Sequence, residues 1–213
     1  MSEHSVTDPS GYQYFDEAHS HSNDYLLPTL AAVLGNLNPN DRRLFEIGCG
    51  NGSTAEWLED CGWCVSGIDP SEQGIRVAQT YRPGLDLHLS ALTPQTAAAY
   101  GQFPIVLSLE VIEHVFFPRD FARDAFNLVE PGGTLILSTP YHGYMKNLAL
   151  ALSGKMDAHF TALCDYGHIK FWSEKTLRIL LSEAGFREIR FLRSGRVAPL
   201  AKSMFAVAQR PSA

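Results

Sequence analysis

The stretch Phe45-Glu46-Ile47-Gly48-Cys49-Gly50-Asn51-Gly52 decides the fold of this chain, because it joins a short apolar segment to three glycines that alternate with other residues. Residues 43–47 are apolar enough to predict a buried strand. Residues 53–61 carry apolar side chains at helical spacing, and Gly62 ends that helix. The glycines let the backbone approach a ligand closely, and the helix that follows offers free N–H groups. The stretch therefore predicts a strand, a ligand-binding turn and a helix.

The same alternation of apolar and amphipathic segments continues along the chain and predicts an α/β domain. Further strands are expected at residues 63–68, 85–89, 105–109, 134–138, 187–193 and 203–209, and further helices at 71–81, 118–129 and 174–184. Residues 130–133 predict a sharp turn. The last two strands have no helix between them, so they must pair antiparallel, because a parallel crossover needs about a dozen residues. The result is a mostly parallel seven-stranded sheet that ends in an antiparallel hairpin.

Length and charge limit the organisation and the partners. With 213 residues, 45% of them hydrophobic, the chain is expected to form a single domain over residues 1–213. Its 23 acidic residues outnumber its 17 basic ones, and no basic run is present, so nucleic acid is not an expected partner. The N-terminus is polar and no apolar stretch reaches the roughly 20 residues that span a bilayer, which predicts a cytoplasmic protein without integral membrane contact. A monomer or a homodimer is expected.

Two segments stand outside the predicted sheet. Residues 11–34 precede the first strand and have helical character, and residues 144–167 are inserted after the fifth strand. Ligands of open α/β sheets bind at the carboxyl ends of the strands. We expect residues 11–34 to form an N-terminal helical cover and residues 144–167 to form a lid over that edge.

Two acids indicate the charge of the ligand. Glu46 stands directly before the glycines, where it would repel a pyrophosphate but hold a cationic α-amino group. Asp69 ends the second predicted strand, seventeen residues after Gly52, where a carboxylate commonly accepts both ribose hydroxyls. Together with glycines at every second position, the two acids favour S-adenosylmethionine over a dinucleotide.

The segment Glu110-Val111-Ile112-Glu113-His114-Val115 resembles the corresponding segment of the ubiquinone-biosynthesis O-methyltransferases and their bacterial small-molecule relatives. The resemblance runs from about residue 44 to 140, and more loosely over 167–185. The order of elements is similar to that of the class I S-adenosylmethionine-dependent methyltransferases, which implies a Rossmann-like three-layer sandwich. It also implies methyl transfer to a hydroxyl or an amine of a small-molecule acceptor. The cofactor-binding residues implied are Glu46, Gly48, Cys49, Gly50, Asp69, Pro70, Ser90, Ala91, Leu92 and Glu110.

Three roles are open to the cluster at the end of the fourth strand. His114 is a candidate general base, because an unperturbed imidazole titrates close to neutral pH. Alternatively, Glu110, Glu113 and His114 share one helical face and ligate a divalent metal, which is possible but not expected. In the third interpretation neither residue takes part in chemistry: Glu113 forms a structural cap or pair, and His114 packs against the lid. His142 is a second candidate base, and the substrate contacts expected are Tyr14, Tyr141, His142, Tyr144 and His168.

Two other functions compete with methyl transfer. A nicotinamide-dependent oxidoreductase would share the glycine turn and Asp69, but the terminal hairpin, the glycine spacing and Glu46 disfavour it. A non-catalytic domain of the same fold would bind S-adenosylmethionine without transferring the methyl group.

Overall fold

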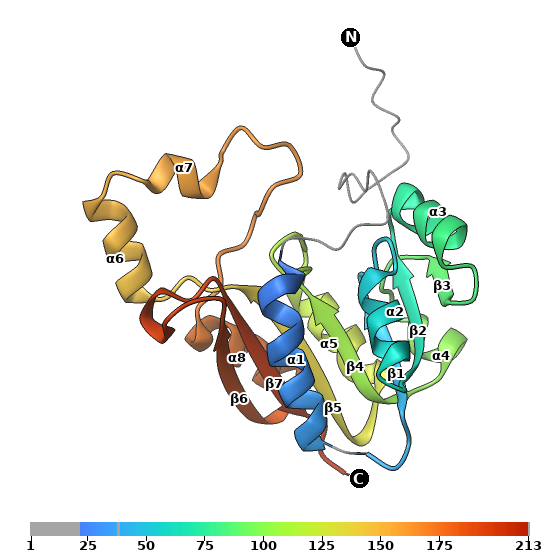
Figure 1. Ribbon diagram of the computed structural model, residues 1–213. Helices are drawn as coiled ribbons and strands as arrows, with labels where there is room; N and C mark the ends of the chain where they lie inside the picture. Colours follow the sequence, from blue (N-terminus) through green and yellow to red (C-terminus); the bar gives the residue numbers. More distant parts are fainter. Residues whose placement is uncertain (1–21, 38, 213) are drawn as a thin grey trace.

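A seven-stranded sheet forms the centre of the molecule in the computed structural model, which describes residues 22–37 and 39–212 (Figure 1). The strands are β1 (Arg43–Ile47), β2 (Cys64–Asp69), β3 (Asp86–Leu89), β4 (Phe103–Leu109), β5 (Val129–Pro140), β6 (Arg187–Ser194) and β7 (Ser203–Gln209). Their spatial order is β3-β2-β1-β4-β5-β7-β6. The first five strands are parallel, and β7 runs antiparallel to both of its neighbours. The predicted sheet and its terminal hairpin are confirmed.

Helices cover both faces of this sheet. One face carries α1 (Asn23–Leu37), α2 (Ser53–Asp60) and α3 (Glu72–Tyr81), and the other carries α4 (Thr96–Tyr100), α5 (Pro118–Leu128) and α8 (Glu174–Ala184). Each face has its own core, because side chains of a strand alternate between the two faces. The three layers follow from this arrangement. A short 3₁₀ helix, η1 (Ala198–Leu200), lies between β6 and β7.

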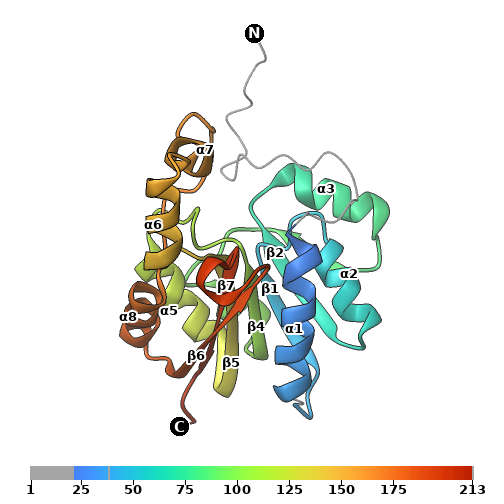
Figure 2. The ribbon, with the colours of Figure 1, turned by 60° about the vertical axis from the view of Figure 1, so that its left-hand side comes forward.

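The insertion after β5 stands apart from the layers. Its helices α6 (Tyr144–Leu152) and α7 (Met156–Phe160) project beyond the carboxyl ends of the strands as an arm (Figures 1 and 2). Neither helix has a fully buried residue. The returning segment, residues 166–172, packs back against the sheet through main-chain hydrogen bonds from Ile169 and Lys170 to the Glu113 carbonyl, both 3.0 Å long.

The N-terminal helix α1 is mainly part of a sheet layer. Leu26, Leu30, Val33 and Leu34 are buried against strands of the sheet. The first turn of the helix reaches the edge where the strands end, and the remainder extends down the sheet face (Figure 1). Residues 11–21 of the predicted cover lie outside the described residues.

The start of β5 differs from the predicted turn. Val129 pairs with Phe103, and the next pair of the ladder joins Thr134 to Ile105, so residues 130–133 bulge out of the strand. Pro104 has no N–H group to donate to the ladder at this point. Gly132 and Gly133 therefore lie in a bulge inside β5 and not in a turn before it.

The core residue Phe205 tests this packing. Its side chain is fully buried in the face that α1 covers, so Phe205→Ala should lower the free energy of unfolding by about 3–5 kcal/mol. The matched control is Phe117→Ala, because Phe117 is 66% exposed and its loss should change stability by less than about 0.5 kcal/mol. Urea unfolding of both variants measures the difference. Equal effects would contradict the assigned core.

Candidate functional site

A cavity of about 1390 Å³ opens at the carboxyl ends of the parallel strands. It lies at β1 and β4, where the strand order reverses, as is typical of ligand sites in open α/β sheets. Its wall combines the first turn of α1, the glycine loop after β1, the ends of β2 and β4, the arm, and the connection between β6 and β7.

The glycine loop is held in a conformation that side chains would disturb. Gly48, Gly50 and Gly52 have φ values of 82°, 52° and 79°, in the left-handed region that favours glycine. The N–H groups of Gly48 and Cys49 both donate to the Ile68 carbonyl, at 2.8 and 3.1 Å. A Cβ atom at Gly48 would overlap the Val111 side chain. The loop therefore lies close against the ends of β2 and β4.

Asp69 fixes this loop from the end of β2. One carboxylate oxygen accepts the Gly50 N–H at 2.8 Å, and the other accepts the Ser71 N–H at 2.7 Å. Asp69 is 5% exposed and lines the cavity. Sequence reasoning missed this loop-holding role. The predicted contact with ribose hydroxyls stays a prediction, because a carboxylate oxygen accepts more than one hydrogen bond.

Glu46 faces the cavity as a buried acid. It is 2% exposed, and its Oε2 atom has no hydrogen-bond partner among the described residues. Burial, with a smaller contribution from the Asp69 charge, raises the pKa of Glu46 to about 8. A cationic group in the cavity would favour its ionised form and satisfy the unpaired oxygen. The acid therefore fits the α-amino group of S-adenosylmethionine.

The segment after β4 forms a turn instead of the predicted helix, so the helical face expected for Glu110, Glu113 and His114 is absent from it. Glu110 has a positive φ of 53°. Its carboxylate accepts hydrogen bonds from the hydroxyls of Ser138 at 2.7 Å and Ser203 at 3.1 Å. Burial raises the pKa of Glu110 to about 7. Glu110 therefore faces the ends of β5 and β7.

The turn brings Glu113 and His114 together with His168, which comes from the segment returning from the arm. Ligand atoms of the three residues lie within 4.8 Å of one another. Glu113 is 1% exposed; its Oε2 accepts from the Thr139 hydroxyl at 3.0 Å, while Oε1 lacks a hydrogen-bond partner among the described residues and lies 3.9 Å from His168 Nε2. Burial raises the pKa of Glu113. These atoms could ligate a metal ion.

One ring nitrogen of His114 is engaged in a hydrogen bond. Its Nδ1 lies 3.1 Å from the Tyr166 carbonyl oxygen, which only accepts hydrogen bonds. This contact assigns the proton of the neutral ring to Nδ1 and leaves Nε2 as an acceptor. Burial lowers the pKa of His114, which favours that neutral form.

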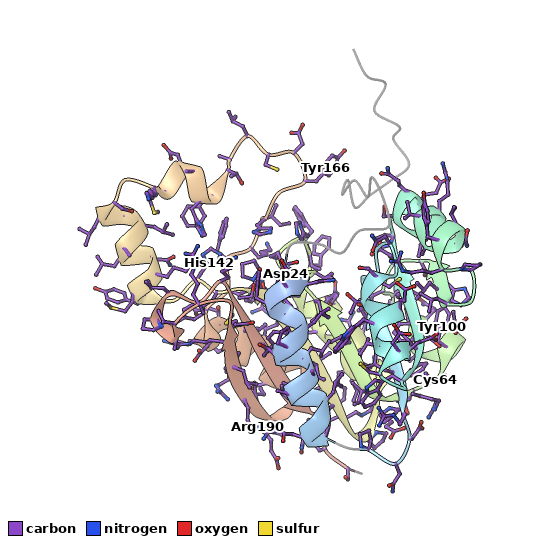
Figure 3. The ribbon with its side chains drawn as sticks, in the orientation of Figure 1. Asp24, Cys64, Tyr100, His142, Tyr166 and Arg190 are labelled. Carbon is purple, nitrogen blue, oxygen red and sulfur yellow. The ribbon has the colours of Figure 1, made fainter. Side chains whose placement is uncertain are left out.

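His142 lies beneath the arm, in an aromatic wall (Figure 3). Its ring stacks on Phe160 at a centroid distance of 5.7 Å and meets the edge of Phe171 at 5.1 Å. Burial lowers the pKa of His142 to about 4, and burial with the neighbouring His114 lowers that of His168 to about 4. Both rings are therefore neutral at pH 7.

Several of the predicted residues do not line the cavity. Tyr141 is 7% exposed in the core, under the guanidinium of Arg193, and Tyr144 is 78% exposed on the arm. Residues 90–92 follow β3 and remain outside the lining, although the Ser90 N–H donates to the Asp69 carbonyl at 3.1 Å. Tyr14 lies outside the described residues. The predicted residues that do line the cavity are Glu46, Gly48, Cys49, Gly50, Asp69, Pro70, Glu110, Glu113, His114, His142 and His168.

Other lining residues carry no sequence signal that could have identified them. They include Tyr25 of α1, Lys146 of α6, and Arg196, Lys202 and Ser203 of the β6–β7 region. The Tyr25 hydroxyl lies 3.4 Å from that of Ser203, although 178 positions separate the two residues. Only the folded topology brings them together.

Comparison with known proteins identifies the kind of domain. A family model described as a methyltransferase domain matches residues 18–190. The ubiquinone biosynthesis O-methyltransferase of Caulobacter sp. (strain K31) is 38% identical over 116 residues, which are 53% of this chain and 46% of the relative. That of Dinoroseobacter shibae is 31% identical over 175 residues, which are 78% of this chain and 70% of the relative. The chain thus spans less than half of the length of the first of these relatives.

Solved structures share the fold. A SAM-dependent methyltransferase from Archaeoglobus fulgidus superposes with a TM-score of 0.63 at 16% identity, over 85% of this chain and 93% of that one. The magnesium protoporphyrin IX methyltransferase of Synechocystis PCC 6803 with bound SAH superposes with a TM-score of 0.62 at 23% identity, over 87% of this chain and 81% of that one. Within the described residues, no helix has the length and apolar character required to cross a membrane.

The buried acid before the glycine loop makes stability depend on pH. Burial raises the Glu46 pKa from 4.5 to about 8, so ionisation destabilises the folded ligand-free protein as pH rises through this window. Glu46→Gln removes the titration. The variant should gain stability relative to wild type from about pH 4.5 to pH 8, by a few kcal/mol in total, since each pKa unit corresponds to about 1.4 kcal/mol.

Urea unfolding across this pH range measures the difference. Glu59→Gln, which removes an exposed acid from α2, controls for the loss of charge. A stability difference between wild type and Glu46→Gln that does not change with pH would contradict the buried acid.

Proposed function

This chain belongs to the class I S-adenosylmethionine-dependent methyltransferases, and we propose that it transfers the methyl group to a hydroxyl, or an amine, of a small-molecule acceptor. The observation that carries the proposal is the His114 ring, which lines the cavity together with Glu46 and the glycine loop and whose Nδ1 contact with the Tyr166 carbonyl leaves Nε2 unprotonated. The 31–38% identity to O-methyltransferases supports a hydroxyl as the acceptor group.

The cofactor end of the cavity is assigned to the β1 and β2 side. Glu46 would bind the α-amino group, the glycine loop would pack against the cofactor, and Asp69 would accept from the ribose hydroxyls. When bound, S-adenosylmethionine supplies a methyl group activated by a sulfonium; transfer breaks the carbon–sulfur bond, forms a carbon–oxygen bond and releases S-adenosylhomocysteine and a proton. The protein must align these atoms and exclude water.

In this proposal His114 takes the proton. Its hydrogen bond to the Tyr166 carbonyl orients the ring, and its lowered pKa keeps the ring neutral at pH 7. A neutral imidazole accepts a proton from a hydroxyl as the oxygen attacks the methyl carbon. His142 is less suited to this role, because burial lowers its pKa to about 4 and so weakens it as a base.

A divalent cation is the second use of the same cluster. The ligand atoms of Glu113, His114 and His168 lie within 4.8 Å of one another, which favours this use. In that case His114 would ligate the cation and orient the acceptor oxygen instead of accepting its proton. The two roles differ in whether a chelator affects turnover.

Cofactor binding tests the β2 end of the site. Asp69 holds Gly50 and Ser71 and would also contact the ribose, so Asp69→Ala should weaken binding of S-adenosylmethionine by roughly 10–100-fold. Isothermal titration calorimetry measures the affinity, with NADH as a ligand that wild type should not bind. Asp60→Ala, which removes an exposed acid at the end of α2, should bind as wild type does.

Two results would count against this site. Unchanged affinity in Asp69→Ala would remove Asp69 from the cofactor site. Binding of NADH by wild type in place of S-adenosylmethionine would reject the methyltransferase assignment itself.

Turnover tests the role of His114. His114→Ala should leave affinity for S-adenosylmethionine within twofold and lower kcat by roughly 10²–10⁴-fold, because proton transfer is lost. The control is His88→Ala, since His88 is exposed on β3 and outside the cavity lining. The assay needs an acceptor, which a screen of hydroxylated and aminated small molecules for S-adenosylhomocysteine release would supply.

The same assay separates the alternatives. Loss of wild-type activity with EDTA and recovery with Mg²⁺ would favour the cation over the base. Full activity of His114→Ala would assign the proton to another group. Cofactor binding with no turnover on any acceptor would favour a non-catalytic binding domain.

A further inference from the structure

We propose that Lys146, Arg196 and Lys202 form an oxyanion-binding subsite in the acceptor half of the cavity, so that the acceptor carries a carboxylate or a phosphate group beside the atom that is methylated. This inference rests on the proposed function and names the chemical class of its substrate. The acceptor is thus a small acid, although the chain as a whole is acidic.

The three cations come from segments that meet only in the folded protein. Lys146 belongs to α6, directly after β5, whereas Arg196 and Lys202 lie between β6 and β7. The Lys146 ammonium lies 3.4 Å from the Lys202 carbonyl oxygen, and the Lys202 ammonium lies 4.7 Å from the centre of the Tyr25 ring. All three residues belong to the lining of one cavity.

Their position in the sheet separates them from the cofactor loop. In the strand order, β1 and β2 lie on one side of β4, and β5 and β7 lie on the other. Glu46 and Asp69 belong to the first side, and the three cations to the second. His114 follows β4 between the two sides. The proposed base therefore stands between the cofactor half and the cationic half of the cavity.

None of the three cations forms an ion pair within residues 22–37 and 39–212. Six of the eleven other arginines do pair with carboxylates, in a chain whose 23 acids outnumber its 17 bases. The paired arginines are Arg43, Arg76, Arg82, Arg119, Arg123 and Arg193. Cations gathered in a cavity without a carboxylate partner fit an anionic ligand.

The charges around Lys146 leave this end of the cavity positive. Burial and the neighbouring Arg196 both lower the pKa of Lys146. Glu110, which accepts hydrogen bonds from Ser138 and Ser203, opposes that shift as the one acid among the described residues that acts on Lys146, so the cations outnumber the acid at this end of the cavity. His142 and His159 also face Lys146, and its charge adds to the lowering of their pKa values. A bound oxyanion would offset the mutual repulsion of the cations.

Apolar side chains define the rest of the acceptor. Leu150 of α6, Phe160 of α7, Phe171 of the returning segment and Leu200 of η1 line the same half of the cavity. They would enclose a flat ring or a short hydrocarbon body. The surface thus fits an acceptor with an apolar body, an oxyanion at one end and a hydroxyl or amine at His114.

Matched probes test the charge of the acceptor. Calorimetry with protein saturated with S-adenosylhomocysteine would compare 4-hydroxybenzoate and 4-hydroxyphenyl phosphate with the neutral 4-hydroxybenzamide, which has a similar shape. We expect at least one anion to bind about tenfold more tightly than the amide. Whether the carboxylate or the phosphate binds more tightly identifies the oxyanion.

Two variants assign the effect to the proposed residues. The double variant Lys146→Met/Arg196→Met should lower affinity for the preferred anion about tenfold or more and leave affinity for the amide and for S-adenosylmethionine within twofold. Lys155→Met is the control, because Lys155 is exposed on the same arm and outside the cavity lining. It should bind all ligands as wild type does.

Three results would overturn the subsite. The first is equal affinity for anions and amide, or no detectable binding of either anion. The second is an unchanged anion affinity in the double variant. The third is a double variant that loses S-adenosylmethionine affinity instead, which would assign the cations to the carboxylate of the cofactor. Each result leaves the methyltransferase assignment intact, since that assignment fails only if wild type does not bind S-adenosylmethionine.

Discussion

The carboxylate of Asp69 is the contact on which the site depends. Its two oxygens accept the N–H groups of Gly50 and Ser71, and so join the turn after β1 to the turn after β2. This double contact holds the glycine loop at positive φ and keeps the end of β1 beside β2. The position of Glu46 at the cavity wall follows, because Glu46 lies two residues before Gly48 on the strand that Asp69 fixes.

The cavity separates charge across the sheet. The buried acid Glu46 stands at the end of β1, and three cations without an ion pair among the described residues stand beside the ends of β5 and β7, where the Glu110 carboxylate also lies. Such a distribution suits two ligands of opposite polarity bound side by side. The neutral histidines between them add no further charge at pH 7, which agrees with a reaction in which a proton has to be accepted.

The features that could be predicted from the sequence are those that depend on short stretches of neighbouring residues. The glycine loop, Asp69 and the alternating segments all carry signals of short range, and the structure contains each of them. Tyr141 and His142 show the limit: neighbours in extended chain point to opposite sides, so one ring lies in the core and the next faces the cavity, and the pattern does not say which. The left-handed backbone of Glu110 begins a turn after β4, where the sequence predicts a helix. The sequence alone could not identify some cavity-lining residues, because their neighbours in the fold are distant in sequence. These residues include Lys146, Lys202 and Tyr25.

The placement of β7 between β5 and β6 also has a consequence for synthesis on the ribosome. Ser203, the first residue of β7, contacts Glu110 and Tyr25, so the cavity wall is complete only when a segment made late has inserted between two made earlier. Until then β5 presents an open edge. The glycine loop and His114 are translated earlier, but the cavity wall then still lacks Lys202 and Ser203. The cavity is therefore complete only after β7 has been translated and has left the exit tunnel.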